Sequence, residues 1–170
     1  MIYMINCNKY LKKLKKFDTS KRSTFSYWFN HVLAFNMTAL NLRMWRFKYL
    51  FHDIEKPWLR LIMPYKKVQK WHRNHTNHHL EWLDKQLSKI GDKYCEYKAV
   101  TKFDWESMMI DWECSRFTKI ASPRTARQET EWLFGINNEE MLKEKYPNIY
   151  HNRDLIYGCC LSTLHVYKFE

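Results

Sequence analysis

The chain has 170 residues, with 29 Lys and Arg against 18 Asp and Glu, so its formal net charge is +11. This length predicts one domain, and an apolar content of 45% is enough for a core, which excludes a disordered basic tail. Only 3 Gly and 4 Pro argue against an all-β sandwich or barrel and against glycine-rich phosphate loops. The positive charge favours polyanionic partners such as nucleotides, nucleic acid or anionic lipid.

The first 22 residues form a basic N-terminal segment, in which Asp18 is the only acidic residue. Tyr10, Leu11, Leu14 and Phe17 recur at helical spacing, which predicts a short basic amphipathic helix. This segment either docks on the domain as a solvated arm or contacts a membrane or nucleic acid. It lacks the apolar stretch of a signal peptide, and no apolar run in the sequence is long enough to predict a membrane span.

The 5 cysteines are odd in number and contain no CxxC pair. This pattern favours reduced thiols over a disulfide framework or a zinc finger. We therefore expect a cytoplasmic protein. The Asn-, Lys- and Tyr-rich composition suits a phage or AT-rich bacterial source, and a phage-encoded chain would act in the host cytoplasm.

Residues 23–170 show helical periodicity almost throughout. One helical face begins at Phe25, a second segment covers 40–51, and Pro57 and Pro64 are expected to interrupt the pattern. Further helices are predicted over 65–73 and over 76–90, where Gly91 closes the helix.

The second half of the chain continues in the same way. Helices are predicted over 102–120, over 123–134 (stopped by Gly135) and over 139–145, with Asn138 as N-cap and Pro147 beyond its end. Residues 155–167 predict either a last helix or an apolar strand. Since no series of alternating strands occurs, we expect one all-α helical bundle, with a core over 23–120 and a helical extension over 121–170.

Six of the 8 histidines lie between positions 31 and 79. His31 has mostly apolar neighbours one helical turn away, so its ring is expected to point inward; taken alone, it would be interpreted as a core histidine. His52 and Asp53 pair an imidazole with a carboxylate, a ligand set that suits zinc, manganese or iron.

A second histidine cluster lies between Trp71 and Trp82. On a continuous helix, His72, His75 and His79 would share one stripe, with His78 on its flank. Such a cluster is poor core material, because buried imidazoles need polar partners; the alternative is an exposed polar segment.

The tripeptide Asp-Trp-Glu occurs twice, seven residues apart, which predicts that Asp104 and Asp111 share a helical face. Asp111 has small or apolar neighbours on this face, so an inward carboxylate there would need a cation. For Asp104 we expect an ion pair with Lys or Arg at the helix surface.

Taken in chain order, these residues resemble the H…HD…H…H…D signature of the HD superfamily of metal-dependent phosphohydrolases. The segment HDIEK (52–56) resembles the HDIGK of its cyclic-dinucleotide phosphodiesterases. The run H-x5-HH (72–79) followed by Asp-Trp is similar to an uncharacterised family of small phage and bacterial HD-like proteins. The resemblance covers about residues 23–116.

The resemblance implies an all-α fold that holds one or two divalent transition-metal ions (Mn, Fe or Zn). The implied ligands are His31, His52, Asp53 and Asp111 for the first ion and His72, His78 and His79 for the second, with Asp53 as a bridge. Asp53 and Lys56 would be catalytic, since Lys56 could bind a phosphoryl oxygen or protonate the leaving oxygen. Arg116 and Lys119 would bind further phosphates.

Two features depart from the family pattern. Glu55 stands where HDIGK has a small residue, and the short gap between His72 and His78 leaves a mononuclear site as an alternative. The expected function is hydrolysis of a phosphate ester, with a nucleotide as the favoured substrate. Two other functions compete with it, a di-iron oxygenase of the same superfamily and a non-catalytic protein that binds nucleic acid or an acidic partner.

Overall fold

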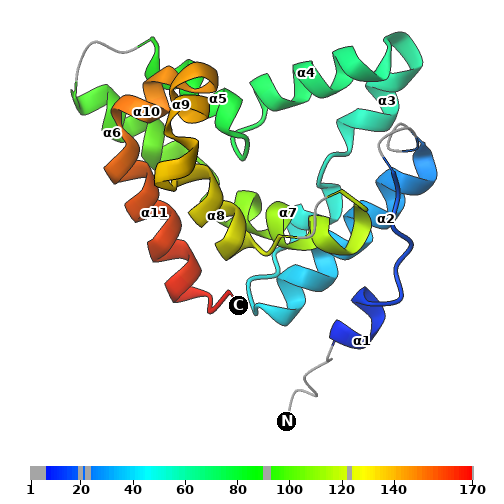
Figure 1. The fold of residues 1–170 in the computed structure, drawn as a ribbon. Helices are drawn as coiled ribbons and strands as arrows, with labels where there is room; N and C mark the ends of the chain where they lie inside the picture. The colour runs from blue at the N-terminus through cyan, green and yellow to red at the C-terminus, as the bar shows by residue number, and fades with distance from the viewer. Residues whose placement is uncertain (1–6, 19–20, 22–23, 90–92, 122–123, 170) are drawn as a thin grey trace.

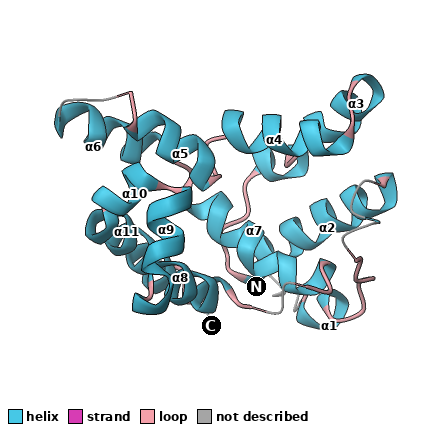
Figure 2. Ribbon diagram, turned by 45° about the horizontal axis from the view of Figure 1, so that its top comes forward, coloured by secondary structure: helices cyan, strands magenta, loops and turns pink. Residues whose placement is uncertain are grey.

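The computed structural model describes residues 7–18, 21, 24–89, 93–121 and 124–169. These residues form helices without any strand, as Figures 1 and 2 show, and the all-α prediction is confirmed. The nearest approach to a sheet among them is one isolated parallel bridge between Phe17 and Lys119. None of the helices in this part of the chain has the length and apolar character that a bilayer crossing requires.

The helical elements follow one another with short connections. In chain order they are α1 (Asn8–Leu11), α2 (Phe25–Asn41), the 3-10 helix η2 (Phe47–Phe51), α3 (Glu55–Ile62), α4 (Tyr65–His75), α5 (Leu80–Leu87), α6 (Lys93–Lys102), α7 (Trp105–Thr118), α8 (Ala126–Phe134), the 3-10 helix η3 (Ile136–Asn138), α9 (Glu139–Lys145), α10 (Pro147–His151) and α11 (Arg153–Val166).

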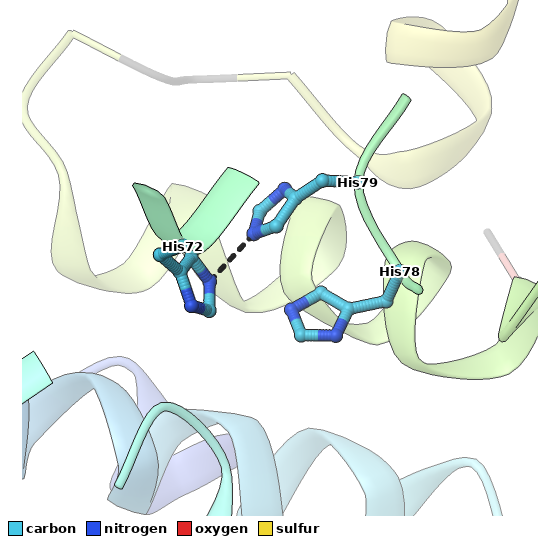
Figure 3. Close-up of side chains that lie close together, drawn as sticks. All are labelled: His72, His78 and His79. Carbon is cyan, nitrogen blue, oxygen red and sulfur yellow. Dashed lines mark hydrogen bonds between the residues drawn. The ribbon is translucent and has the colours of Figure 1, made fainter. Parts of the chain in front are cut away.

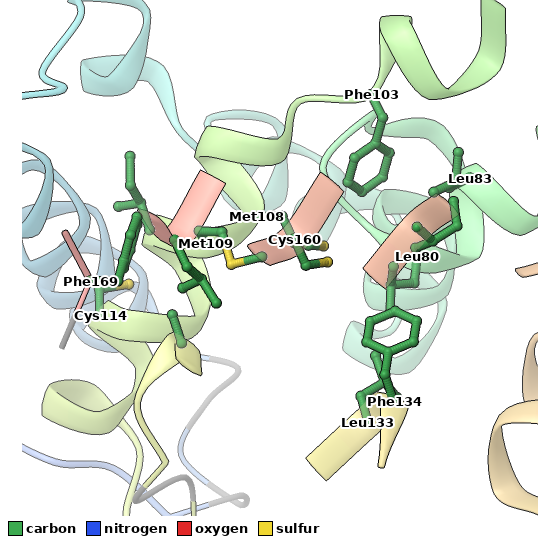
Figure 4. Packing of buried hydrophobic residues seen from close by; sticks show 14 of the residues in the cluster. Leu80, Leu83, Phe103, Met108, Met109, Cys114, Leu133, Phe134, Cys160 and Phe169 are labelled. Atoms are coloured by element: carbon green, nitrogen blue, oxygen red, sulfur yellow. The ribbon is translucent and has the colours of Figure 1, made fainter. Parts of the chain in front are cut away.

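Helices α2 and α7 pack against each other at the centre of the fold. Ala34 and Phe35 of α2 and Met109 and Ile110 of α7 are completely buried. Helix α11 packs on α7 and α8, and Figure 4 shows Cys160 of α11 next to the two buried methionines of α7. Each large apolar side chain buried here contributes about 1.5–3 kcal/mol of transfer free energy, which fixes the distance and rotation of α2 and α7.

The described part of the basic N-terminal segment docks along α2. Leu11 is buried, the Phe17 ring packs edge-on against Tyr27, and the Asn30 side chain donates to the Lys15 carbonyl at 2.8 Å. The helix α1 is shorter than the spacing predicts. The Phe17 N–H instead donates to the Thr118 carbonyl at 2.9 Å, which holds this part of the chain extended.

Several predicted helix ends are wrong, each for a local reason. Pro57 does not interrupt the chain, because it lies in the first turn of α3, where a missing N–H leaves no bond unmade. Segment 40–51 is not one element. Helix α2 runs on to Asn41, and the chain then turns at Arg43 (φ 57°) before η2 begins.

The later boundaries show the same pattern. The helix predicted over 102–120 begins only at Trp105, since Asp104 is its N-cap and accepts the Ser107 N–H at 3.1 Å. The helix predicted over 123–134 begins at Ala126, after a Thr125 capping box, and residues 155–167 are helical rather than strand-like. Asn138 stands at the N-cap position of α9, but its side chain donates to the Trp132 carbonyl. Gly91, predicted to end a helix, lies outside the described residues.

Candidate metal centre

The carboxylate of Asp53 lies at the centre of a cluster of imidazole rings from four parts of the chain. Its Oδ1 is 3.0 Å from His72 Nε2, 3.6 Å from His52 Nε2 and 3.9 Å from His78 Nε2. Its Oδ2 is 3.8 Å from His31 Nε2. All five residues are buried. The structure therefore brings these predicted ligands together, although they are spread over 48 positions of the sequence.

The backbone at Asp53 adopts the left-handed conformation, with φ 59°. A residue other than glycine pays about 1 kcal/mol or more for this conformation, and such residues gather where the surrounding structure needs a particular side-chain direction. Here the indole Nε1 of Trp28 donates to the Asp53 carbonyl at 2.9 Å and so ties the strained residue to α2. The left-handed backbone conformation directs the Asp53 carboxylate into the imidazole cluster.

His31 and Asp111 connect the centre to the α2–α7 pair. His31 Nε2 lies 2.9 Å from Asp111 Oδ1. The other ring nitrogen, Nδ1, lies 3.5 Å from Thr118 Oγ1 and 3.8 Å from Cys114 Sγ, so the ring is held from behind. The prediction that His31 points inward is confirmed. His52 is fixed in a similar way, because its ring stacks on Phe35 with centroids 3.7 Å apart.

The second histidine group is formed by His72, His78 and His79 (Figure 3). The helix predicted from position 76 begins only at Leu80, since Thr76 leaves the helical conformation and its hydroxyl donates to the His72 carbonyl. The turn that follows carries both later histidines back toward α4. His79 Nε2 lies 2.7 Å from His72 Nε2, a distance at which two ring nitrogens must share a proton or a cation.

The single histidine stripe predicted for a continuous helix is therefore wrong. His75 is exposed, stacks on Trp71 and lies near its carbonyl, away from the cluster. The short gap between His72 and His78 is no obstacle to joint ligation, because the chain reverses at the turn instead of continuing along one axis.

Glu55 is a site residue that sequence reasoning treated only as a departure from the motif. Its Oε1 contacts His72 Nδ1, the ring nitrogen on the side away from Asp53 and His79. A carboxylate behind a histidine ligand fixes the ring orientation and increases its basicity, as in carboxylate–histidine–metal arrangements. Nothing in the spacing of these residues indicates this pair, since it depends on how α3 packs against α4.

Two buried ring nitrogens at the centre, His52 Nε2 and His78 Nε2, have no hydrogen-bond partner among the described residues. Asp53 Oδ1 between them is in reach of one ring alone, His72 Nε2 at 3.0 Å. Leaving a buried polar atom unsatisfied costs about 1–3 kcal/mol, and these atoms lie in one cluster where a cation would satisfy them together. In the part of the chain that the structure describes, four groups of three residues each have ligand atoms within 4.8 Å of one another: His31/His52/Asp53, His72/His78/His79, His31/Asp111/Cys114 and Asp53/Glu55/His72. The donor set therefore fits a metal ion.

The protonation states of Asp53, His52 and His79 suit metal binding, whereas His72 favours the protonated form. Burial raises the pKa of Asp53, but the Lys56 ammonium and the contact with His72 outweigh it and hold this pKa well below its usual range. Burial lowers the pKa of His72, but its contacts with Asp53 and Glu55 outweigh burial and raise this pKa, so a metal ion would displace a proton from this ring. Burial also lowers the pKa of the His52 and His79 rings well below the usual value. Neutral imidazoles next to an ionised carboxylate are competent ligands without prior loss of a proton.

The predicted phosphate-binding residues divide into two that reach the site and one that does not. Lys56 forms an ion pair with Asp53 Oδ2. Lys119 lies at the rim of a pocket of about 260 Å³ that His78, His79 and Asp111 also line, called here the basic pocket.

Arg116 points elsewhere. It pairs with Glu113 at 2.6 Å and covers the Phe117 ring, beside a different pocket. Its position in the helix places it on the far side of α7 from Asp111, so the prediction that it binds phosphate finds no support in the geometry. Asp104 lies outside the centre as expected, because it pairs with Lys48 and caps α7.

Comparison with family models, with curated proteins and with solved structures gave no match to this chain. The resemblance to the HD superfamily therefore stays a prediction from the motifs.

Proposed function

We propose that this protein is a metal-dependent phosphohydrolase that acts on a phosphate ester, with a nucleotide as the favoured substrate. The observation that carries the proposal is the buried carboxylate of Asp53 among four imidazoles, with a lysine and a basic pocket at the same centre. A purely structural core would gain nothing from burying so many ionisable groups together, since each loses its hydration.

Imidazoles combined with carboxylates favour Mn, Fe or Zn over harder cations. His31, His52, Asp53 and Asp111 would hold one ion, and His72, His78 and His79 would hold a second. Bound divalent ions of this kind supply an acidified water as nucleophile and neutralise charge on phosphoryl oxygens. We therefore propose two ions. The alternative is a mononuclear centre, because either ligand group alone could hold one ion.

The protein's own groups would position the ester. Burial lowers the pKa of Lys56, but its contact with Asp53 outweighs this effect and raises the pKa above its usual value, so the ammonium stays charged. It can donate to a phosphoryl oxygen or to the leaving oxygen. In the basic pocket, Lys119 would supply positive charge for further phosphates, and Arg73 and Arg124 would do so by exchanging their present partners Glu81 and Glu129 for a phosphate.

Metal content and turnover test this proposal. Protein purified in the presence of Mn²⁺ should contain one or two ions per chain and should hydrolyse members of a nucleotide and phosphate-ester panel. Asp53→Asn should abolish turnover and reduce the metal content, whereas Asp154→Asn, in the first turn of α11, should change neither.

Three results would contradict the assignment. Full activity of Asp53→Asn would show that the cluster is not the reaction centre. Protein that contains no bound metal after purification with added Mn²⁺ would favour the non-catalytic alternative. Turnover that requires both iron and oxygen would replace hydrolysis by the oxygenase alternative.

A further inference from the structure

A second pocket opens onto the same centre from another set of elements. It measures about 210 Å³ and is lined by Asp53, His31 and Lys56 on the side of the centre. Its other walls come mainly from α2, α3 and the start of α4, and the basic pocket shares no lining residue with it. We call it the apolar pocket. Since His31 and Asp111 are in contact and each lines a different pocket, the two pockets meet at the candidate metal centre.

The walls of the apolar pocket are dominated by rings and aliphatic groups. The residues are Phe25, Tyr27, Trp28, Pro57, Leu61 and Tyr65. Phe25 and Leu61 are 67% and 77% exposed, although both side chains are large and apolar. Each would lose contact with water if an apolar group entered the pocket, which favours binding by about 25 cal/mol for each Å² covered.

Three hydrogen-bonding side chains of these walls already have partners inside the protein, whereas Arg60, which also lines the pocket, has one long contact with the Met63 carbonyl at 3.5 Å. The Trp28 N–H donates to the Asp53 carbonyl, and the Tyr65 hydroxyl accepts from Gln69 at 2.8 Å. The Thr24 hydroxyl donates to the Lys21 carbonyl and accepts the Tyr27 N–H. Apart from Arg60 and the inner wall at Lys56 and Asp53, the pocket therefore selects by shape and apolar surface.

The volume fits one ring. A cavity of about 150 Å³ lined by Leu, Ile and Phe is large enough to bind benzene, so about 210 Å³ leaves room for one ring and a short link. Because Asp53 and Lys56 form the inner wall, such a link of one or two bonds would place an attached phosphate at the centre.

We infer that the apolar pocket binds the organic group of the substrate, a compact aromatic ring close to the phosphorus, while the basic pocket takes its remaining anionic groups. The inference rests on the proposed function for the identity of the phosphate end. It replaces the favoured nucleotide by a smaller ester, because a nucleotide places a ribose between its aromatic base and its phosphate and would need more than about 210 Å³. The pocket itself is independent of catalysis, so its occupant can be tested without turnover.

Binding of two phosphonates to the Mn²⁺-loaded protein, measured by calorimetry, tests the inference. Benzylphosphonate and ethylphosphonate share the headgroup, have no ester bond to hydrolyse and differ in the ring. Benzylphosphonate should bind at least about tenfold more tightly, because the ring buries apolar surface on both partners. Equal affinities would overturn the inference.

The chain offers matched variants. Phe25→Ala and Leu61→Ala should each reduce the preference for the ring about threefold or more, since part of the wall is lost. Phe47→Ala and Ile62→Ala are controls, because these side chains are also 67% and 77% exposed but do not line the pocket. All four positions are exposed, so the variants should fold. An equal loss in the controls would contradict a defined pocket.

A metal-independent measurement separates this inference from the proposed function. Benzyl alcohol should bind to the metal-free protein, detected by ligand-observed NMR, and binding should weaken in Phe25→Ala but not in Phe47→Ala. If the protein bound benzyl alcohol in this way but no metal, the proposed function would fail while the pocket stood. Absence of benzyl alcohol binding would overturn the pocket assignment.

Discussion

Removal of the carboxylate behind His72 should weaken metal binding without removing a metal ligand. Glu55 Oε1 contacts His72 Nδ1, and the two side chains are 27% and 2% exposed, so water cannot easily replace the carboxylate on the histidine side. Loss of such a supporting group typically reduces metal affinity 10- to 100-fold, which corresponds to about 1.4–2.7 kcal/mol. We expect about tenfold for Glu55→Gln, which keeps an acceptor oxygen, and up to about 100-fold for Glu55→Ala.

The assay is a competition titration in which a chromophoric chelator competes with the protein for Mn²⁺ or Zn²⁺. Glu139→Ala is the control, since Glu139 also lies in the first turn of a helix and is paired with a basic side chain, but lines neither pocket at the centre. Both alanine variants should lose the favourable interaction of a first-turn carboxylate with the helix dipole, about 0.3–1 kcal/mol. Wild-type metal affinity in Glu55→Ala, or an equal loss in Glu139→Ala, would refute the role of Glu55.

Three further changes have defined outcomes. In metal-free protein, Asp53→Gly should be about 1 kcal/mol more stable to urea than Asp53→Ala, because only glycine adopts φ 59° without strain; equal stabilities would refute the strain. Asp104→Ala should cost about 1 kcal/mol and Asp104→Asn only a few tenths, since Asn also caps helices. Burial raises the Asp104 pKa, but the bond from Lys48 outweighs burial and lowers this pKa below its ordinary 3.8. The contribution of the carboxylate to the free energy of unfolding is therefore present above that pH and is lost as the pH falls through the folded-state pKa. Urea titrations of Asp104→Asn at several pH values should lack this part of the acid destabilisation. Leu164→Ala should cost about 2–5 kcal/mol in thermal unfolding, and Leu155→Ala, at a position 47% exposed, much less; similar losses would place the core elsewhere.

The class of fold could be predicted because helical periodicity is a local property. The spacing of apolar side chains indicates a helix wherever 3–4-residue repeats persist, and the described residues confirm it from Phe25 to Val166. Helix ends were predicted less well. They depend on competition between the helix and side-chain caps such as Asp104 and Thr125, and on turns such as Thr76–His79.

The candidate site divides in the same way. The inward direction of His31 was predicted from its apolar neighbours, but its role as a ligand together with His52 and Asp53 was implied by the resemblance to the HD signature. Taken alone, a histidine in such surroundings is interpreted as a core residue. The sequence did not indicate that Glu55 supports His72 or that Arg116 turns away from Asp111. Both facts depend on the rotation of a helix about its axis, which is set by its packing partners.

The sequence by itself determined an all-α chain with a set of histidines and aspartates suited to a transition metal. Only the tertiary structure decided which of them meet. The α2–α7 packing brings His31 to Asp111, and the strained backbone at Asp53 and the turn after His75 bring the remaining ligands to one carboxylate. The reason is physical: composition and periodicity act over a few residues, whereas a metal centre is defined by distances of a few ångströms between segments that only the packed core can hold together.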